Sequence, residues 1–253
     1  MDRALSVLEY VAQAPSPQTI PDVSAALGLN ITTTYHLFNT LEACGYLARN
    51  ADRTIRIGSR VGMLYRAMLS DLAIPRDLRP CVETLSSRVS ESAYLTGWTD
   101  QAVIIQAVVE PPQALRVTGL YIGYRENEVY RASGKAVLAY LPPSERAPVI
   151  ERNLAERPRD ADYMTNDLPA ELAAVAKHGY AVDDEEYTPG VCCVAAPYFN
   201  ADGSISGSVA VSLPAFGFSQ RRRELIEAVR ATAKECSALL GYVGQEPSSA
   251  PAE

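Results

Sequence analysis

The feature that most constrains the fold is a pair of short helical segments separated by Gly28-Leu29-Asn30. A helix start signal lies in Thr19-Ile20-Pro21-Asp22, which has a capping residue and a weakened capping box. The helix that follows stops at the glycine of the turn. Asn30 then caps a second helix, which is predicted to run to Cys44 and to end at Gly45. Two helices joined in this way form a helix–turn–helix, whose second helix can enter the major groove of DNA.

The second helix of this pair has an apolar and a polar face when its residues are projected at about 100° each. The predicted core face carries Thr34, Leu37, Phe38, Leu41 and Cys44. The opposite face carries Thr32, Tyr35, His36, Asn39 and Thr40, and no acidic group. Hydroxyl and amide groups can hydrogen-bond to base edges or phosphates, and threonine methyls can contact thymine methyls. A solvated surface face is the alternative, but such faces normally carry Lys and Glu, and this one carries neither.

A short hairpin with arginines follows the second helix. Two alternating strands are predicted on either side of Asn50-Ala51-Asp52, at residues 46–49 and 53–57. Arginines on the outward side of such a wing suit contact with phosphates or the minor groove. A soluble hairpin with exposed charges is the other interpretation. The candidate DNA-contact residues of helix and wing are Thr32, Thr33, Tyr35, His36, Asn39, Arg49, Arg53 and Arg56.

Charge is distributed unevenly along the chain. Residues 1–70 hold six Arg and five Asp or Glu, a charge of +1, whereas the remainder carries −8, so the chain has a net charge of −7. A nearly neutral segment with local arginines, joined to a larger acidic one, indicates two domains with different partners. Between them, a helix from Ser59 with an apolar stripe, stopped by Pro75, predicts a connector or a surface that packs on a second copy.

Several classes of protein are excluded by composition. No apolar run approaches the ~18 residues of a membrane-spanning helix, and no signal peptide is visible, so we expect no membrane association. Five scattered cysteines fit a reducing cytoplasm better than a disulfide scaffold. The only histidines are His36 and His178, too few for a metal site built on imidazole ligands, and we expect no metal and no cofactor.

The remainder of the chain predicts an α+β sheet domain, because strands in mixed order are flanked by helices at both ends. Helices are predicted at residues 79–90, 134–141, 144–155, 168–178 and 219–242, the last capped by Ser219. Strands are predicted at residues 93–98, 102–109, 115–121, 191–199 and 204–213. The tail at 244–253 is rich in Gly, Pro, Ser and Ala and is expected to be disordered.

Three features of this domain could bind a small molecule. Ala132-Ser133-Gly134-Lys135 places small residues at a helix N-terminus, which can attract an anion, although ordinary capping also explains it. Of Cys192 and Cys193, only one can point inward from a single strand, and both could be small buried hydrophobes. Arginines and aromatic residues near the middle strands could pair with a carboxylate or wall a site, but salt bridges and core packing are equally consistent: Arg116, Arg125, Arg131, Tyr94, Trp98, Tyr121 and Tyr130.

The order of these elements and the local sequence resemble the IclR family of bacterial transcription regulators. Characteristic pieces are Leu27-Gly28-Leu29-Asn30, Ala132-Ser133-Gly134-Lys135-Ala136 and Val191-Cys192-Cys193. The likeness extends in order over residues 3–8, 27–37, 40–47, 57–61, 132–139, 179–186, 190–197 and 207–212. The resemblance implies a winged helix–turn–helix, a linker helix and a GAF-like antiparallel-sheet domain with flanking helices that binds a small effector. It also implies dimers that pair into tetramers.

The resemblance also implies an effector site. It assigns Cys193 to the inward, ligand-lining position, with Ser212 on the neighbouring strand and Asp183 or Asp184 at the rim. The helix start contributes Ser133, Gly134, Lys135 and Ala136. The chain departs from the family where Ile31 and His36 replace the usual basic residues, and where Ala210 and Leu213 replace residues of the ligand region.

The sequence therefore predicts a cytoplasmic, oligomeric, effector-responsive transcription regulator without enzymatic activity. Residues 1–58 are expected to bind double-stranded operator DNA and residues 59–77 to connect. Residues 78–243 are expected to bind a small organic acid, which could be an aromatic carboxylate. One alternative is an enzyme or small-molecule-binding GAF-like protein with an appended DNA-binding-like domain, which would have neither a Ser–His–Asp set nor metal ligands. Another is an interaction protein that binds no ligand.

Overall fold

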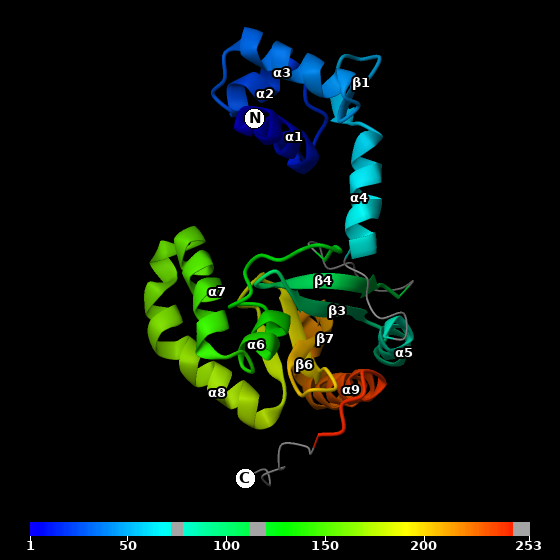
Figure 1. Cartoon of the computed structure of the whole chain (residues 1–253), viewed down its shortest axis with the longest axis vertical. Helices are drawn as coiled ribbons and strands as arrows, with labels where there is room; N and C mark the ends of the chain where they lie inside the picture. Colours follow the sequence, from blue (N-terminus) through cyan, green and yellow to red (C-terminus); the bar gives the residue numbers. More distant parts are fainter. Residues whose placement is uncertain (72–77, 112–119, 245–253) are drawn as a thin grey trace. The chain divides into compact units, whose positions relative to one another are not determined.

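The computed structural model describes residues 1–71, 78–111 and 120–244 of the chain (Figure 1). The contact pattern separates the chain into two units, residues 1–71 and residues 72–253. Each unit has its own buried hydrophobic core. Within the described part of the chain, no helix combines the length and the apolar character needed to cross a membrane.

The first unit is a winged helix–turn–helix followed by a further helix, which confirms the predicted fold of this segment. Its elements are α1 (Asp2–Gln13), α2 (Ile20–Ala26), α3 (Ile31–Ala43), β1 (Leu47–Arg49), β2 (Ile55–Ile57) and α4 (Arg60–Asp71). The two strands of the wing are antiparallel, and Gln18 bridges to Ile55 beside them. The core of the unit is made of Val7, Ile20, Val23, Phe38, Leu41, Leu47 and Ile55.

Local capping explains where the helix–turn–helix begins and ends. The backbone N–H and the hydroxyl of Thr19 both donate to the Asp22 carboxylate, at 2.8 and 2.6 Å. The side-chain oxygen of Asn30 accepts the N–H of Thr32 at 2.9 Å and so caps α3. The prediction that Cys44 belongs to the core face is wrong: the helix ends one residue earlier, the chain turns away, and the thiol is exposed.

The second unit is an α+β domain, as predicted. Its helices are α5 (Arg79–Val89), α6 (Ala132–Leu138), α7 (Pro143–Glu156), α8 (Leu168–His178) and α9 (Phe218–Leu239). Short helical turns lie at Pro158–Asp160, Tyr163–Asp167 and Ala215–Gly217. Its strands are β3 (Ser92–Thr99), β4 (Ala102–Val109), β5 (Ala181–Asp184), β6 (Val191–Phe199) and β7 (Ile205–Pro214).

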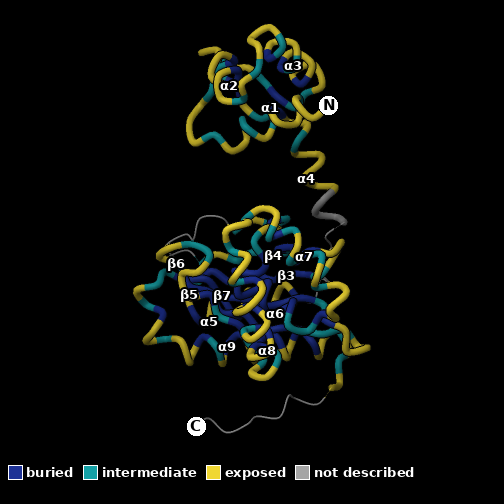
Figure 2. The backbone as a smooth tube through the Cα atoms, turned by 90° about the vertical axis from the view of Figure 1, so that its left-hand side faces the viewer, coloured by how far each residue is buried: buried dark blue, intermediate teal, exposed yellow. Residues whose placement is uncertain are grey.

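The five strands form one antiparallel sheet in the order β4-β3-β7-β6-β5. Helices α5 and α9 pack against one face, where they share a core with Leu95, Val194 and Val211. Helix α6 packs against the other face, over β6 and β7, and α8 packs in turn against α6. Figure 2 shows the central strands as buried and much of the outer surface of the flanking helices as exposed. The sheet is therefore the middle layer of the domain.

Some details of the second unit differ from the sequence expectations or lie outside the described residues. Strand β5 was not predicted, because it is short and ends in two acidic residues. Helix α6 begins two residues earlier and ends three residues earlier than expected. Ser219 does not cap α9, because a turn ending at Gly217 starts the helix at Phe218. The strand expected at 115–121 and the expected disorder of 244–253 fall mainly on residues 112–119 and 245–253, outside the described residues; Leu120 and Tyr121 are not in a strand.

Candidate functional site

The polar face of α3 is open to solvent on the opposite side of the helix from its core residues. Thr34, Phe38 and Leu41 are buried and fix the helix against the rest of the unit. The candidate DNA-contact residues of this helix lie outward: Thr32, Tyr35, His36 and Asn39 are exposed, and Thr33 is half-buried. The hydroxyl of Thr40, on the same face, donates to the backbone carbonyl of His36 at 2.9 Å. That hydroxyl is already bonded within the helix.

The three wing arginines do not share one face. Arg49 lies on the same face of the hairpin as Leu47, and its guanidinium lies 4.8 Å from the centroid of the Phe38 ring of α3. Arg56 pairs with Ala48 on the opposite face of the hairpin and is exposed. Arg53 lies in the connecting turn with a left-handed φ of +69°, a conformation that is strained for a residue with a side chain. All three are exposed cations, but the cation of Arg49 is held on an aromatic ring.

In the second unit, the strand register aligns four buried polar residues across the sheet. Asp183 of β5 pairs with Cys193 of β6, Cys193 pairs with Ser212 of β7, and Ser212 pairs with Ser92 of β3. Directly paired residues of antiparallel strands project to the same face. Cys193 belongs to the core that includes Ala132 and Ala136 of α6, so this face is the one that α6 covers. We refer to Asp183, Cys193, Ser212 and Ser92 as the polar row.

The sulfur of Cys193 and the hydroxyl oxygen of Ser212 lie 3.1 Å apart in this row. Burial raises the pKa of the Cys193 thiol to about 12, and the nearby Asp183 carboxylate adds to the rise. The thiol therefore stays protonated near neutral pH, where it acts as a weak hydrogen-bond donor. Asp184 and Cys192 lie on the opposite face, where their side chains form a 3.2 Å hydrogen bond.

Helix α6 lies against this face, and all of its residues are buried. Gly134 is required there for packing, since a Cβ at this position would lie 2.0 Å from the carbonyl oxygen of Glu128. Gly134 thus allows the backbone of α6 to lie close to the backbone at Glu128. The buried hydroxyl of Ser133 has no hydrogen-bond partner of good geometry, although the Tyr94 hydroxyl lies near it.

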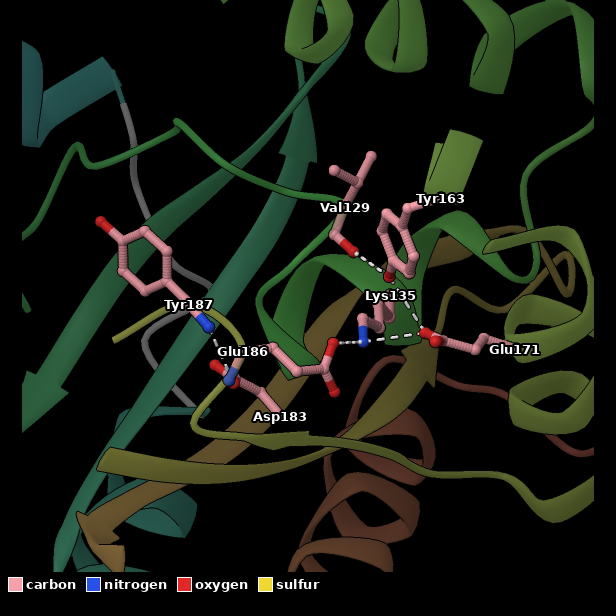
Figure 3. Close-up of polar contacts among 7 residues, drawn as sticks. All are labelled: Val129, Lys135, Tyr163, Glu171, Asp183, Glu186 and Tyr187. Atoms are coloured by element: carbon pink, nitrogen blue, oxygen red, sulfur yellow. Dashed lines mark hydrogen bonds and ion pairs between the residues drawn. The ribbon is translucent and has the colours of Figure 1, made fainter. Parts of the chain in front are cut away.

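Lys135 forms an ion-paired cluster between α6, α8 and the segment after β5 (Figure 3). Its side chain is 2% exposed, and its ammonium lies 2.9 Å from the Glu171 carboxylate and also pairs with Glu186. The hydroxyl of Tyr163 donates to the same Glu171 carboxylate at 3.1 Å. Two acidic side chains of the chain itself therefore neutralise the charge of Lys135.

The segment that follows β5 is held at its base by Asp183. One oxygen of this carboxylate accepts the backbone N–H groups of Glu186 and Tyr187, at 2.9 and 3.2 Å (Figure 3). Burial raises the pKa of Asp183 to about 6 despite these two hydrogen bonds. The hydroxyl of Tyr187 lies 2.6 Å from that of Tyr124. The segment is thus attached both to the polar row and to the buried Tyr124.

Of the predicted effector residues, Asp183, Cys193 and Ser212 lie on the sheet face that α6 covers, and Ser133, Gly134 and Ala136 lie in α6 itself. The Lys135 ammonium instead pairs with Glu171 of α8 and with Glu186, and Asp184 lies on the opposite face of the sheet. Among the three arginines considered for a carboxylate, Arg116 lies outside the described residues, Arg125 is exposed and Arg131 is buried. Ser92 was missed. Its signal was the alternation of Ser92, Tyr94 and Thr96 with the apolar Ala93 and Leu95, which places the polar members on one face.

Comparison with known proteins decides the family. The family model described as the IclR C-terminal domain of bacterial transcriptional regulators matches residues 66–238, and the IclR helix-turn-helix model matches residues 1–51. The chain belongs to the IclR family of bacterial transcriptional regulators. Its DNA-binding helix–turn–helix and its α+β domain are the two parts that the family combines.

Individual IclR-family relatives match nearly the whole chain. The transcriptional repressor YiaJ of Escherichia coli is 28% identical over 95% of this chain and 87% of its own length. The regulator Rv1719 of Mycobacterium tuberculosis is 30% identical over 90% of this chain and 87% of its own. A crystal structure of an IclR homologue from Microbacterium hydrocarbonoxydans, complexed with 4-hydroxybenzoate, has a TM-score of 0.69 and 19% identity, covering 94% of this chain and 97% of that one. At that identity the likeness shows the fold alone.

Proposed function

We propose that this IclR-family chain is a cytoplasmic transcription regulator whose binding to operator DNA is modulated by a small organic acid. Residues 1–58 bind DNA, residues 59–77 connect and residues 78–243 bind the effector, in a homodimer or homotetramer. The ligand acts through a difference in affinity for the DNA-competent and DNA-incompetent arrangements of the oligomer. The 4-hydroxybenzoate complex of a homologue supports an acid, including an aromatic one, as the class of effector.

The observation that carries the DNA-binding half is the solvent-exposed face of α3, whose side chains are uncharged donors and acceptors. Thr32, Tyr35 and Asn39 are exposed there, while Phe38 on the other side anchors the helix. In the major groove, such groups can hydrogen-bond to base edges without repulsion from phosphates. The exposed Arg53 and Arg56 supply the phosphate contacts that this helix lacks.

The enzymatic alternative is disfavoured by the state of Cys193. A cysteine nucleophile needs a thiolate, which requires a lowered pKa or an adjacent base. Burial instead raises the pKa of this thiol to about 12, and its hydrogen-bond partner is the hydroxyl of Ser212. The protonated thiol of Cys193 and the hydroxyl of Ser212 therefore suit hydrogen bonding to a ligand better than covalent chemistry.

The DNA-binding half can be tested by selection from random duplexes with the full chain. We expect the wild type to enrich one sequence, and we expect a triple variant, Thr32→Ala with Tyr35→Phe and Asn39→Ala, to bind DNA without that enrichment. Equal enrichment by the triple variant would show that this face does not read bases. Light scattering on the complex measures the oligomeric state.

The effector half needs a separate measurement. A thermal-shift screen of small mono- and dicarboxylates, aliphatic and aromatic, identifies compounds that bind the full chain. Each compound that raises Tm is then added to the DNA complex. A compound that binds and also changes operator affinity supports the proposal, whereas binding without any change in operator affinity contradicts a regulatory role for it.

A further inference from the structure

Arg131 is a buried cation without an acidic partner among the described residues. It directly precedes α6 and is 5% exposed. Its Nη2 donates to the carbonyl oxygen of Val103 at 3.1 Å, whereas Nε and Nη1 are buried and have no hydrogen-bond partner. The guanidinium lies over the ring of Tyr124, 5.0 Å from its centroid. Two donor atoms of a permanently charged group are therefore unpaired in the interior.

The charged groups around Arg131 are bonded to other partners. Lys135 is paired with two carboxylates, as described above. The carboxylate of Glu128, which is fully buried, accepts a 2.6 Å hydrogen bond from Arg152. The carboxylate of Asp183 accepts two backbone N–H groups. None of these acidic groups forms an ion pair with Arg131 within the described residues.

A buried charge without a counter-charge is strongly unfavourable. Lysine or histidine can escape this cost by losing a proton, but a guanidinium stays protonated at any physiological pH. Arg131 therefore offers unpaired N–H donors together with a positive charge that no acidic side chain of the described residues balances, and an added anion would satisfy both. Carboxylates are well matched to it, because a carboxylate oxygen accepts a strong charge-assisted hydrogen bond from a guanidinium N–H group.

The groups near this cation are the neutral hydrogen-bonding side chains of the polar-row face. Burial raises the pKa of Tyr94 and of Cys193, and the positive charge of Arg131 opposes the rise at both, which places the guanidinium within electrostatic reach of each. The unpaired hydroxyl of Ser133 lies near Tyr94. A ligand whose anion binds Arg131 thus has hydroxyl and thiol groups beside it for its remaining polar atoms.

We propose that Arg131 binds the carboxylate of the effector and that, as one unpaired cation, it selects monocarboxylates over dicarboxylates. The proposal rests on the proposed function, in that the bound acid is the regulatory ligand. In this proposal the anion is bound by the charged side chain of Arg131. An anion site at the first turn of α6 would instead use backbone N–H groups and the helix dipole. The proposal also excludes Lys135 as the anchor, because that ammonium is neutralised by the chain itself.

Small carboxylates can test binding at Arg131 even though the natural effector is not identified. Thermal unfolding of the full chain is measured in sodium formate, sodium oxalate, sodium chloride and formamide, with the salts at matched ionic strength. We expect formate to raise Tm by about 2 °C or more above chloride in a saturable manner, because a ligand that binds only the folded state stabilises it. Oxalate should raise Tm less than formate, and formamide should have no effect.

Two variants separate the charge of Arg131 from general effects of salt. In Arg131→Met the formate response should disappear, and in Arg131→Lys, which keeps the charge, it should persist at reduced size. Arg152→Met is the matched control, because this arginine is paired with the buried Glu128. Arg152→Met should lower Tm while keeping the formate response.

The ligand-free variants give a second readout. Arg131→Met should unfold at the wild-type Tm or higher, since it removes an unpaired charge, whereas Arg152→Met leaves Glu128 unpaired. Three outcomes would overturn the proposal. The first is an equal formate response in wild type and Arg131→Met, and the second is a larger rise in Tm with oxalate than with formate. The third is a loss of Tm in Arg131→Met as large as in Arg152→Met. Arg131→Met should still bind operator DNA in the absence of ligand. If the wild type itself does not bind a specific operator, the DNA-binding proposal fails, and the formate measurement still tests Arg131 independently.

Discussion

Asp183 lies directly opposite Cys193 in the antiparallel pairing of β5 with β6, and both side chains are buried on the face that α6 covers. Their sequence neighbours, Asp184 and Cys192, meet on the other face at 3.2 Å. The carboxylate and the thiol therefore share an interior of low polarity, in which each is harder to ionise. The polar row is consequently a set of largely neutral groups at mildly acidic pH.

The raised pKa of Asp183 predicts a stability that falls as pH rises. Because this pKa is about 6 instead of 3.8, the folded chain binds the proton more tightly than the unfolded chain. The resulting stabilisation is full below about pH 4 and is lost as pH rises through 6. At about 1.4 kcal/mol per pKa unit, the loss is on the order of 3 kcal/mol.

Urea unfolding of wild type and Asp183→Asn between pH 4 and pH 7.5 measures this effect. The fluorescence of Trp98, the single tryptophan, reports on the second unit. The wild type should lose stability relative to Asp183→Asn as pH rises. Asp184→Asn, exposed on the opposite face, is the matched control. A difference between wild type and Asp183→Asn that does not change with pH would contradict the burial of an ionisable Asp183.

Gly134→Ala is expected to destabilise the second unit by about 1–3 kcal/mol or more, because overpacking forces the backbone apart. The added Cβ would lie 2.0 Å from the carbonyl oxygen of Glu128. Gly217→Ala meets no atom within 4 Å and should cost only about 1 kcal/mol or less, through loss of the glycine that caps α9. The free energy of unfolding, again followed by Trp98 fluorescence, distinguishes the two. Similar values for both variants would mean that α6 does not approach Glu128 so closely.

The face of α3 predicts which substitutions affect sequence-specific binding. Thr32→Ala, Tyr35→Phe and Asn39→Ala should each weaken binding to a selected operator by about 1–3 kcal/mol, the range expected for loss of one base contact. Thr40→Ala should have a smaller effect, because that hydroxyl is bonded to the His36 carbonyl. Titration of labelled operator measures these affinities. Unchanged affinities in the first three variants would remove this face from the DNA interface.

The wing arginines should differ in what their removal costs. Arg56→Ala should weaken binding to all sequences and reduce the slope of log affinity against log salt by about 1, as expected for one phosphate contact. Arg53→Gly should weaken DNA binding similarly while stabilising the first unit, because glycine adopts the left-handed φ without strain. Arg49→Ala should lower stability as well, through loss of the contact with Phe38. Salt slopes and thermal unfolding of the three variants test these expectations, and an unchanged salt slope in Arg56→Ala would exclude a phosphate contact.

Much of the first unit could be predicted from sequence, because its signals are local. The Asn30 cap, the glycine after α3 and the spacing of Phe38 and Leu41 act within one or two helical turns. The assignment of Cys44 to the core face was wrong because the spacing of apolar residues does not indicate at which residue a helix ends. Strands β4 and β6 were equally accessible, as continuous apolar runs bounded by turns.

The sequence by itself determined the helix–turn–helix, strands such as β4 and β6 and the alternation that separates Cys192 from Cys193, because each depends on contacts between near neighbours in the chain. The tertiary structure decided which distant residues meet: the alignment of Asp183, Cys193, Ser212 and Ser92 across four strands, the neutralisation of Lys135 by Glu171 and Glu186, and the unpaired state of Arg131. The physical reason is that strand register and the pairing of buried charges depend on packing between segments that are far apart in the sequence. A local sequence pattern does not indicate which distant residue will be the partner.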